Sequence, residues 1–296
     1  MKTKGYLMIL IAGILWGTIG FFVSILTEMG VDSSTTAFLR ISLGTLILIP
    51  LMLSMGGKKL FCIDRRGLLT CIALGLLCQA LFNFSYAGAI SRVGVATASV
   101  LLYTSPVFVC VMSRLFFKER IGAVKLFALA VNVIGSILTV TGGNFTSIRF
   151  SVYGAAAGVA AGFLYALMTI ISTTTEKYHP LTIIFYSFLF GSIALAVMTP
   201  PWEDISRVMD LSFILAAAGY GLIPTVGSYY FYMKGLSCNL ETSKVPVIAS
   251  IETVVAAIIS ICIFNEAAGA WKMAGICCVV ISILLMNMIK PKKASE

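Results

Sequence analysis

Apolar runs of about 20 residues, separated by short polar segments, follow one another along the whole chain. A helix needs about 20 mostly apolar residues to cross the hydrocarbon core of a bilayer, so these runs predict membrane spans. Apolar residues make up 59% of the chain, against roughly 45–50% in soluble domains. We therefore expect an all-α, polytopic membrane protein without a soluble domain and with ten transmembrane helices, at approximately 6–27, 34–55, 67–89, 95–117, 121–140, 151–172, 180–199, 211–233, 243–264 and 269–289.

Lysine and arginine are unevenly distributed between the two sides of this predicted bundle. With the N-terminus inside, all but five of the 21 Lys and Arg residues fall at cytoplasmic ends and loops; the exceptions are Arg40, Arg92, Arg149, Arg207 and Lys272. Because Lys and Arg are enriched in cytoplasmic loops, the distribution predicts a multi-pass protein of the cell membrane with both termini cytoplasmic. The net charge of +9 then reflects topology, and we expect no nucleic-acid partner.

The second half of the chain repeats the first at a shift of 147 residues. Polar and charged residues coincide under this shift: Ser113 with Ser260, Glu119 with Glu266, and Lys125 with Lys272. Near the start, a shift of 149 pairs Trp16 with Tyr165. Each half has five spans, an odd number, so the second repeat must be inverted relative to the first. We expect the repeats to occupy residues 1–144 and 145–296.

The two repeats also share a distinctive ending. Each closes with a helix, a glutamate at the turn and a last helix, in "SPVFVCVMSRLFFKE" and "IETVVAAIISICIFNE". Together with Pro106 thirteen residues before Glu119, and with "AFLRISLG" in the second span, this pattern resembles the EamA family of the drug/metabolite transporter superfamily. The family usually has Glu-Pro where this chain has Glu252 and Thr253, which leaves a helix kink there open. The resemblance implies a solute transporter, commonly an exporter of metabolites or amino acids, and does not fix the substrate.

Glu252 is the acidic residue nearest the middle of a predicted span. A charged side chain at the bilayer centre costs at least about 2.5–3.5 kcal/mol unless it is paired, hydrated or protonated, so such residues face the protein interior. Glu252 is therefore a candidate for substrate binding and for proton coupling. The alternative is a hydrogen-bonded glutamate that joins helices. Lys244 on the same span could pair with it or extend to the cytoplasmic interface.

Polar and aromatic side chains gather on two further spans. Gln79, Asn83 and Tyr86 share one helical face, which must look inward because lipid would leave the amides unsatisfied. The counterpart span supplies three tyrosines, of which we assign Tyr229 and Tyr230 to the substrate pathway; the third is Tyr232, and Pro224 can distort this helix. Contacts between helices explain the amides equally well, and tyrosines near helix ends are also ordinary membrane-interface anchors.

The fourth span carries Tyr103, Ser105 and Pro106. Ser105 corresponds to Glu252 under the shift, and Pro106 is expected to bend the helix at the cavity. Trp16 and Tyr165, at matching positions of the two repeats, are expected to line opposite sides of the pathway.

Three more charged residues have structural or functional alternatives. Glu119 and Glu266 lie at helix junctions, where the partial positive charge of a helix N-terminus favours a carboxylate, and we interpret both as structural caps. Arg40 could attract an anionic substrate or pair with an external acid such as Glu28 or Asp32.

Catalytic and cofactor motifs are lacking in the sequence. His179 is the single histidine, the eight cysteines show no metal-ligand spacing, and no nucleotide-binding motif is present. We therefore expect neither metal nor cofactor nor enzymatic activity. The hypothesis is a secondary transporter that moves an amino acid-like, amine or other amphipathic solute, with export as the expected direction, and is driven by a proton gradient or by the solute gradient. Its partners would be the solute and the bilayer, and it would be a monomer or homodimer. The competing hypothesis is an intramembrane enzyme or scaffold that acts on lipid.

Overall fold

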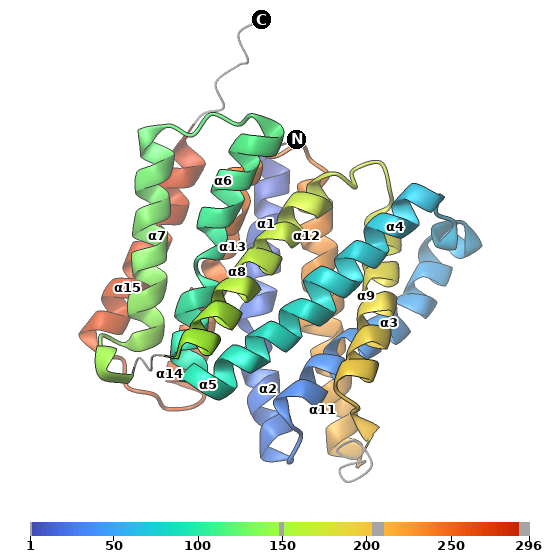
Figure 1. Ribbon diagram of the computed structural model, residues 1–296, viewed down its shortest axis with the longest axis horizontal. Helices are drawn as coiled ribbons and strands as arrows, with labels where there is room; N and C mark the ends of the chain where they lie inside the picture. The colour runs from blue at the N-terminus through green and yellow to red at the C-terminus, as the bar shows by residue number, and fades with distance from the viewer. Residues whose placement is uncertain (1, 148–150, 203–209, 290–296) are drawn as a thin grey trace, which may run out of the picture.

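The computed structural model describes residues 2–147, 151–202 and 210–289, and these form a bundle of long helices (Figure 1). In the first half the elements are α1 (Lys2–Gly17), α2 (Ile19–Glu28), α3 (Ser33–Gly56), the 3-10 helix η1 (Gly57–Phe61), α4 (Arg65–Ala73), the π-helix η2 (Leu74–Leu81), α5 (Phe82–Leu102), α6 (Ser105–Phe117), α7 (Ala123–Thr141) and the 3-10 helix η3 (Phe145–Ser147). In the second half they are α8 (Val152–Thr173), α9 (Pro180–Met198), α11 (Leu211–Gly221), the π-helix η4 (Leu222–Gly227), α12 (Ser228–Leu236), the 3-10 helix η5 (Thr242–Lys244), α13 (Val245–Ala249), α14 (Ile251–Cys262) and α15 (Ala270–Met288).

The predicted all-α, polytopic fold is confirmed. Within the described ranges, nine helical stretches are long and apolar enough to cross a membrane, and α6 is a shorter apolar helix. The break predicted between spans 67–89 and 95–117 is shorter than expected, because α5 continues through it and its backbone is non-helical only at Gly94, with φ 81° and ψ 164°. Glycine adopts a positive φ at little cost, so this residue joins two helical stretches without a loop. Arg149 and Arg207, two exceptions to the charge distribution, lie outside the described residues.

Short polar side chains start several of the helices. The carboxylate of Asp32 accepts a hydrogen bond from the Ser34 amide at 3.0 Å, at the start of α3. Asp64 and Asp210 cap α4 and α11 in the same way, at 2.9 Å and 2.7 Å. Such caps satisfy N–H groups that have no partner inside the helix. The sequence thus fixes where several spans begin.

Backbone irregularities recur in both halves. The π-helices η2 and η4 interrupt the third and eighth spans. Lys118 and Asn265, 147 residues apart, both adopt left-handed backbone conformations, with φ 53° and 54°. Side chains other than glycine adopt this conformation rarely, so the match is more specific than a match of apolar residues. It supports a two-repeat architecture.

Close packing of α1 against the second half places Trp16 in the centre of the bundle. A Cβ atom on Gly13 would lie 2.5 Å from the Ala249 carbonyl oxygen, and one on Gly17 would lie 2.5 Å from the Val255 Cβ atom. Only small residues allow helices to approach this closely. Trp16, between these two glycines, is 4% exposed.

A buried charge network lies at the terminal face, which we define as the face where α1 begins and α15 ends. Lys125 of α7 forms an ion pair with Glu241 and donates a hydrogen bond to the Ser243 hydroxyl at 3.2 Å. Lys244 lies 3.4 Å from the Glu241 carboxylate and donates to the Ile289 carbonyl oxygen at 2.6 Å. Burial by itself would raise the pKa of Glu241, but the hydrogen bond and charge of Lys125, with the charge of Lys244, outweigh it and lower the pKa.

The substitution Glu241→Gln is expected to lower the free energy of unfolding at neutral pH by about 3 kcal/mol, because it leaves two buried ammonium groups without a carboxylate. Ionised Glu241 stabilises the fold above its ordinary pKa of 4.5, and this stabilisation is lost as the pH falls through the lowered pKa. Thermal unfolding in detergent should therefore show a difference between wild type and variant that shrinks in acid. Glu28→Gln, at an exposed acid of the opposite face, is the control and should change little. If the difference in thermal stability between wild type and Glu241→Gln did not change with pH, the ionised Glu241 would not be the source of the stabilisation.

Candidate functional site

Two spans are interrupted near their middle, and the interruptions meet. The fourth span breaks at Tyr103 and Thr104, between α5 and α6, and the ninth breaks at Ser250, between α13 and α14. The Thr253 hydroxyl donates a hydrogen bond to the Tyr103 hydroxyl at 3.1 Å and joins the two breaks. The ninth span is thus interrupted even though Thr253 replaces the usual proline. Discontinuous helices of this kind supply the central sites of many transporters.

Ser105 and Pro106 lie beside the first break. Ser105 is the first residue of α6 and is 3% exposed. Pro106 is in the first turn of α6, where its missing N–H group costs nothing. The structure therefore places the proline just after a break in the span, at the position where the sequence predicts a bend.

Glu252 lies in the first turn of α14 and is half-buried. The N-terminal turn of a helix carries partial positive charge, which favours a carboxylate. No hydrogen bond or ion pair joins Glu252 to another residue in the described part of the chain. Its nearest titratable neighbours are tyrosines, since its charge acts on the hydroxyls of Tyr86, Tyr103 and Tyr165. Lys244, the partner that the sequence offered, is engaged instead in the terminal-face network.

An aromatic cluster lies close to Glu252. The Trp16 ring is surrounded by three tyrosine rings, with centroids at 6.3 Å for Tyr165, 5.5 Å for Tyr229 and 4.9 Å for Tyr232. Trp16 and Tyr165 thus contact each other edge to face and do not lie on opposite sides of a pathway. The charge of Glu252 also acts on the hydroxyls of Tyr229 and Tyr232.

Tyr230 and Tyr232 have different surroundings. Tyr230 is half-buried, and its hydroxyl accepts a hydrogen bond from the exposed ammonium group of Lys234 at 3.1 Å. Tyr232 is 2% exposed and its hydroxyl bonds to that of Thr169 at 2.7 Å. Tyr229 and Tyr232 are three residues apart and share one helical face, whereas Tyr230 does not. That spacing is the signal by which the sequence could have selected Tyr232.

The third span brings its amides to the same cluster. Gln79 donates to the Tyr229 hydroxyl at 3.0 Å, and that hydroxyl can donate to the Gln79 side-chain oxygen at 3.3 Å. Asn83 accepts a hydrogen bond from the Arg40 guanidinium at 3.5 Å. Tyr86 and Ser99 share a hydrogen bond of 3.0 Å. All three predicted side chains therefore face inward.

Arg40 is a buried cation without an acidic partner. It is 8% exposed, and no carboxylate in the described ranges lies within ion-pair distance of its guanidinium, so the expected pairing with Glu28 or Asp32 is absent. Its charge acts on the hydroxyls of Tyr165 and Tyr229, two of the tyrosines on which the charge of Glu252 also acts. Arg40 and Glu252 thus approach the same aromatic rings.

A cavity of about 510 Å³ extends from Asn83 toward the end of the bundle opposite the terminal face. We call that end the opposite face. Its lining includes Ser34 of α3, Asn83 and Arg92 of α5, Tyr153 of α8 and Thr199 at the C-terminal end of α9. Ser34 and Tyr153 are in the first turns of their helices and Thr199 directly follows α9, and among the described residues that line this cavity none is acidic. It has the size of a small-molecule site.

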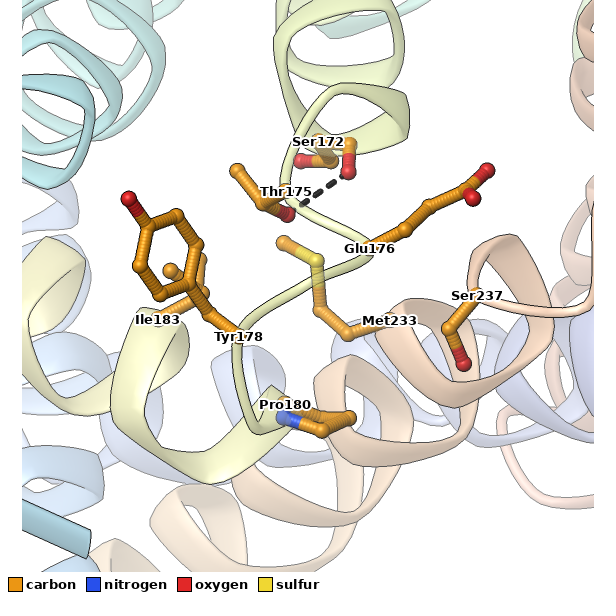
Figure 2. A pocket seen from close by; sticks show the side chains of 8 residues that line it. All are labelled: Ser172, Thr175, Glu176, Tyr178, Pro180, Ile183, Met233 and Ser237. Atoms are coloured by element: carbon orange, nitrogen blue, oxygen red, sulfur yellow. Dashed lines mark hydrogen bonds between the residues drawn. The ribbon is translucent and has the colours of Figure 1, made fainter. Parts of the chain in front are cut away.

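The terminal face is closed by comparison. A pocket between α8, α9 and α12 has a volume of only about 10 Å³, which is roughly the room that one water needs. Figure 2 shows Thr175 and Met233 next to each other in the middle of this pocket, with Tyr178 at its side. This pocket is thus far smaller than the cavity toward the opposite face.

The two junction glutamates make different bonds. Glu119 accepts hydrogen bonds from the Thr242 amide at 2.5 Å and the Ser243 amide at 3.1 Å, at the start of η5. Glu266 accepts a hydrogen bond from the Lys272 ammonium group at 2.7 Å. Glu119 thus caps a helix of the other repeat, whereas Glu266 pairs within its own.

Asn132 of α7 is a buried polar residue outside the predicted set. It is 1% exposed and donates to the Ser250 hydroxyl at 2.6 Å and the Ser282 hydroxyl at 2.9 Å. It therefore holds the break in the ninth span. An amide in the middle of an apolar run is the sequence signal for such a residue. In the described ranges, no group of His, Cys, Asp and Glu residues could hold a metal ion.

Removing the Tyr229 hydroxyl should destabilise the site. We expect Tyr229→Phe to lower the free energy of unfolding by about 1–3 kcal/mol, because the Gln79 amide is left buried without its partner. Tyr230→Phe is the matched control, since its hydroxyl bonds to an exposed lysine, and its unfolding midpoint should remain that of the wild type. Equal midpoints for the two variants in detergent would refute the Gln79 contact.

Known proteins with similar sequences are membrane transporters. The sequence profile of the EamA-like transporter family matches residues 3–141 and again residues 152–288. An uncharacterized transporter of Archaeoglobus fulgidus is 30% identical over 286 residues, covering 95% of this chain and 95% of that protein. The uncharacterized inner membrane transporter YicL of Salmonella typhimurium is 26% identical and covers 98% of this chain and 97% of its own.

One relative has a named substrate, and one solved structure has the same fold. The pseudopaline exporter CntI of Pseudomonas aeruginosa is 29% identical over 201 residues, covering 65% of this chain and 67% of that protein. A solved crystal structure superposes with a TM-score of 0.83 over 97% of this chain and 98% of the other, at 16% identity. At that identity the likeness shows a shared fold.

Proposed function

Because the chain belongs to the EamA-like transporter family, we propose that it is a secondary transporter that moves a small solute across the cell membrane by alternating access. The observation that carries this proposal is the meeting of two interrupted spans beside Glu252 and the Trp16 cluster. Residues 1–144 and 145–296 would be the two moving repeats. The Lys and Arg distribution supports a cytoplasmic terminal face.

The charges at the site support an amino acid-like solute. Arg40 and Glu252 are both without an ionic partner in the described ranges, and both act on Tyr165 and Tyr229. Buried charges are costly unless compensated, so a solute that carries a carboxylate and an amine would satisfy both. The Trp16 cluster offers ring faces for an amine or an apolar side chain. An exporter among the relatives is consistent with outward transport.

The solute class can be tested with matched ligands. We expect Arg40→Gln to weaken binding of amino acids by about tenfold or more, since it removes a charge-assisted hydrogen bond, and to leave binding of the corresponding decarboxylated amines unchanged. Thermal-shift titration of purified protein with each pair measures this. The control is Arg92→Gln, which removes a cavity-lining arginine that bonds to its own helix. Equal losses for acid and amine would argue against a carboxylate site at Arg40.

Proton coupling is assigned to Glu252, the one acid in the middle of a predicted span. In proteoliposomes, we expect Glu252→Gln to abolish accumulation driven by a pH gradient, while solute exchange across the bilayer continues at a lower rate because the amide binds the amine of the solute less tightly. Protonation of the carboxylate is the step that the amide cannot perform. Glu28→Gln, which removes an acid at an exposed helix end, should accumulate solute like the wild type. Accumulation that persists in Glu252→Gln would leave facilitated diffusion as the mode of transport.

A further inference from the structure

The turns that carry Glu119 and Glu266 have the same backbone geometry. Each glutamate follows a left-handed residue, Lys118 or Asn265. The Glu119 amide donates to the Ser113 carbonyl oxygen at 3.3 Å, and the Glu266 amide donates to the corresponding carbonyl of Ser260 at 3.1 Å. The two turns therefore hold their carboxylates in equivalent positions, at opposite faces of the bundle.

At the terminal face, the Glu119 carboxylate crosses to the second repeat. Besides the amides of Thr242 and Ser243, it accepts the Ser243 hydroxyl at 2.5 Å. Lys125 donates to the same hydroxyl and pairs with Glu241. These bonds tie the α6–α7 turn to the start of the ninth span and close this face.

At the opposite face, the equivalent contact is open. Val95 and Ala96 stand 147 residues before Thr242 and Ser243, in the first turn of the helical stretch that begins after Gly94. The first amides of such a stretch have no partner within it. Val95 is 63% exposed, and the Glu266 side chain, 52% exposed, is held by Lys272 instead.

We propose that Glu119 and Glu266 are alternate locks, of which one closes its face at a time. In the conformation that closes the opposite face, Glu266 leaves Lys272 and accepts the amides of Val95 and Ala96. Glu119 then releases Thr242 and Ser243. The proposal rests on alternating access by two inverted repeats, each of which adopts in turn the conformation that the other shows here.

The two locks differ in strength. Ser243 gives Glu119 a hydroxyl bond that Ala96, at the equivalent position, cannot give Glu266. At the position equivalent to Glu241 the first repeat has Gly94, so it offers no carboxylate like the one that pairs with Lys125. The terminal face is thus the more firmly closed, which agrees with the cavity of about 510 Å³ toward the opposite face.

A cysteine at Ser85 would report the state of the opposite face. Ser85 lines the cavity and is half-buried, whereas Tyr232, its equivalent in the closed half, is 2% exposed. Maleimide labelling of Ser85→Cys is measured in nanodiscs, where both faces are accessible, and is quantified on its own peptide by mass spectrometry. Labelling of the native Cys238, at the terminal face, should become faster when labelling of Ser85→Cys becomes slower.

The first expected result is a loss of labelling when the terminal lock is weakened. In the Ser85→Cys background, Ser243→Ala should lower the ratio of protein with the opposite face open to protein with it closed by about tenfold, the effect of one hydrogen bond to a charged group. Labelling should slow in proportion to the fraction that remains open. Ala96→Ser should also slow labelling, because its hydroxyl strengthens the Glu266 lock. This variant tests the proposal by itself if Ser243→Ala does not fold. Unchanged labelling in the folded variants would overturn the proposal.

The decisive result is the effect of Glu266→Gln on these variants. Because it removes the carboxylate that closes the opposite face, it should restore labelling to the rate of Ser85→Cys alone. Labelling that stays slow would show that Glu266 is no lock. Solute flux is measured separately, so a protein without flux whose labelling follows this pattern would contradict the transport function and leave the locks standing.

Discussion

The backbone of a membrane-spanning chain must satisfy its own hydrogen bonds, and this constraint organises the whole structure. In lipid, each unsatisfied N–H or C=O group is costly, so irregular backbone survives only where protein or a water-filled cavity surrounds it. Irregular segments within the described spans include η2, η4 and the breaks at Thr104 and Ser250. All four belong to the spans that supply the amides, the tyrosines and Glu252. The departures from regular helix therefore mark the site.

The inverted repeat brings those segments together. Three hydrogen-bonded pairs are each 150 residues apart: Gln79 with Tyr229, Tyr103 with Thr253, and Asn132 with Ser282. This separation exceeds the repeat shift of 147 by three residues, so each residue contacts a position about one helical turn from its own equivalent in the other repeat. In an object with two-fold symmetry, such self-contacts occur only near the axis. The axis thus passes through the interrupted spans, as the proposed alternating access by two inverted repeats requires.

Hydropathy predicted the spans because apolar length is a local property, and the 147-residue shift predicted the repeat because charged turns are rare in this chain. Other features depend on tertiary contacts and could not be read locally. Gly94 was indistinguishable from a loop glycine, since its role depends on the helices on both sides of it. The sequence left open whether Arg40 attracts an anionic substrate or pairs with an external acid, and in the structure it is buried against Asn83. The direction of the Arg40 side chain depends on how the third span packs against the second. The sequence around Arg40 carries no information about that packing.

The charged residues of the described structure divide by whether they are satisfied. Lys125, Glu241 and Lys244 complete one another at the terminal face and need no ligand. Arg40 and Glu252 have no such partners, although both lie among aromatic rings in the middle of the bundle. An uncompensated buried charge lowers stability, and a fold can retain it where water, a proton or a solute supplies the missing interaction. The first group meets the cost of buried charge with its own ion pairs, and the second group does not, which is why we propose the second group as the site for a solute.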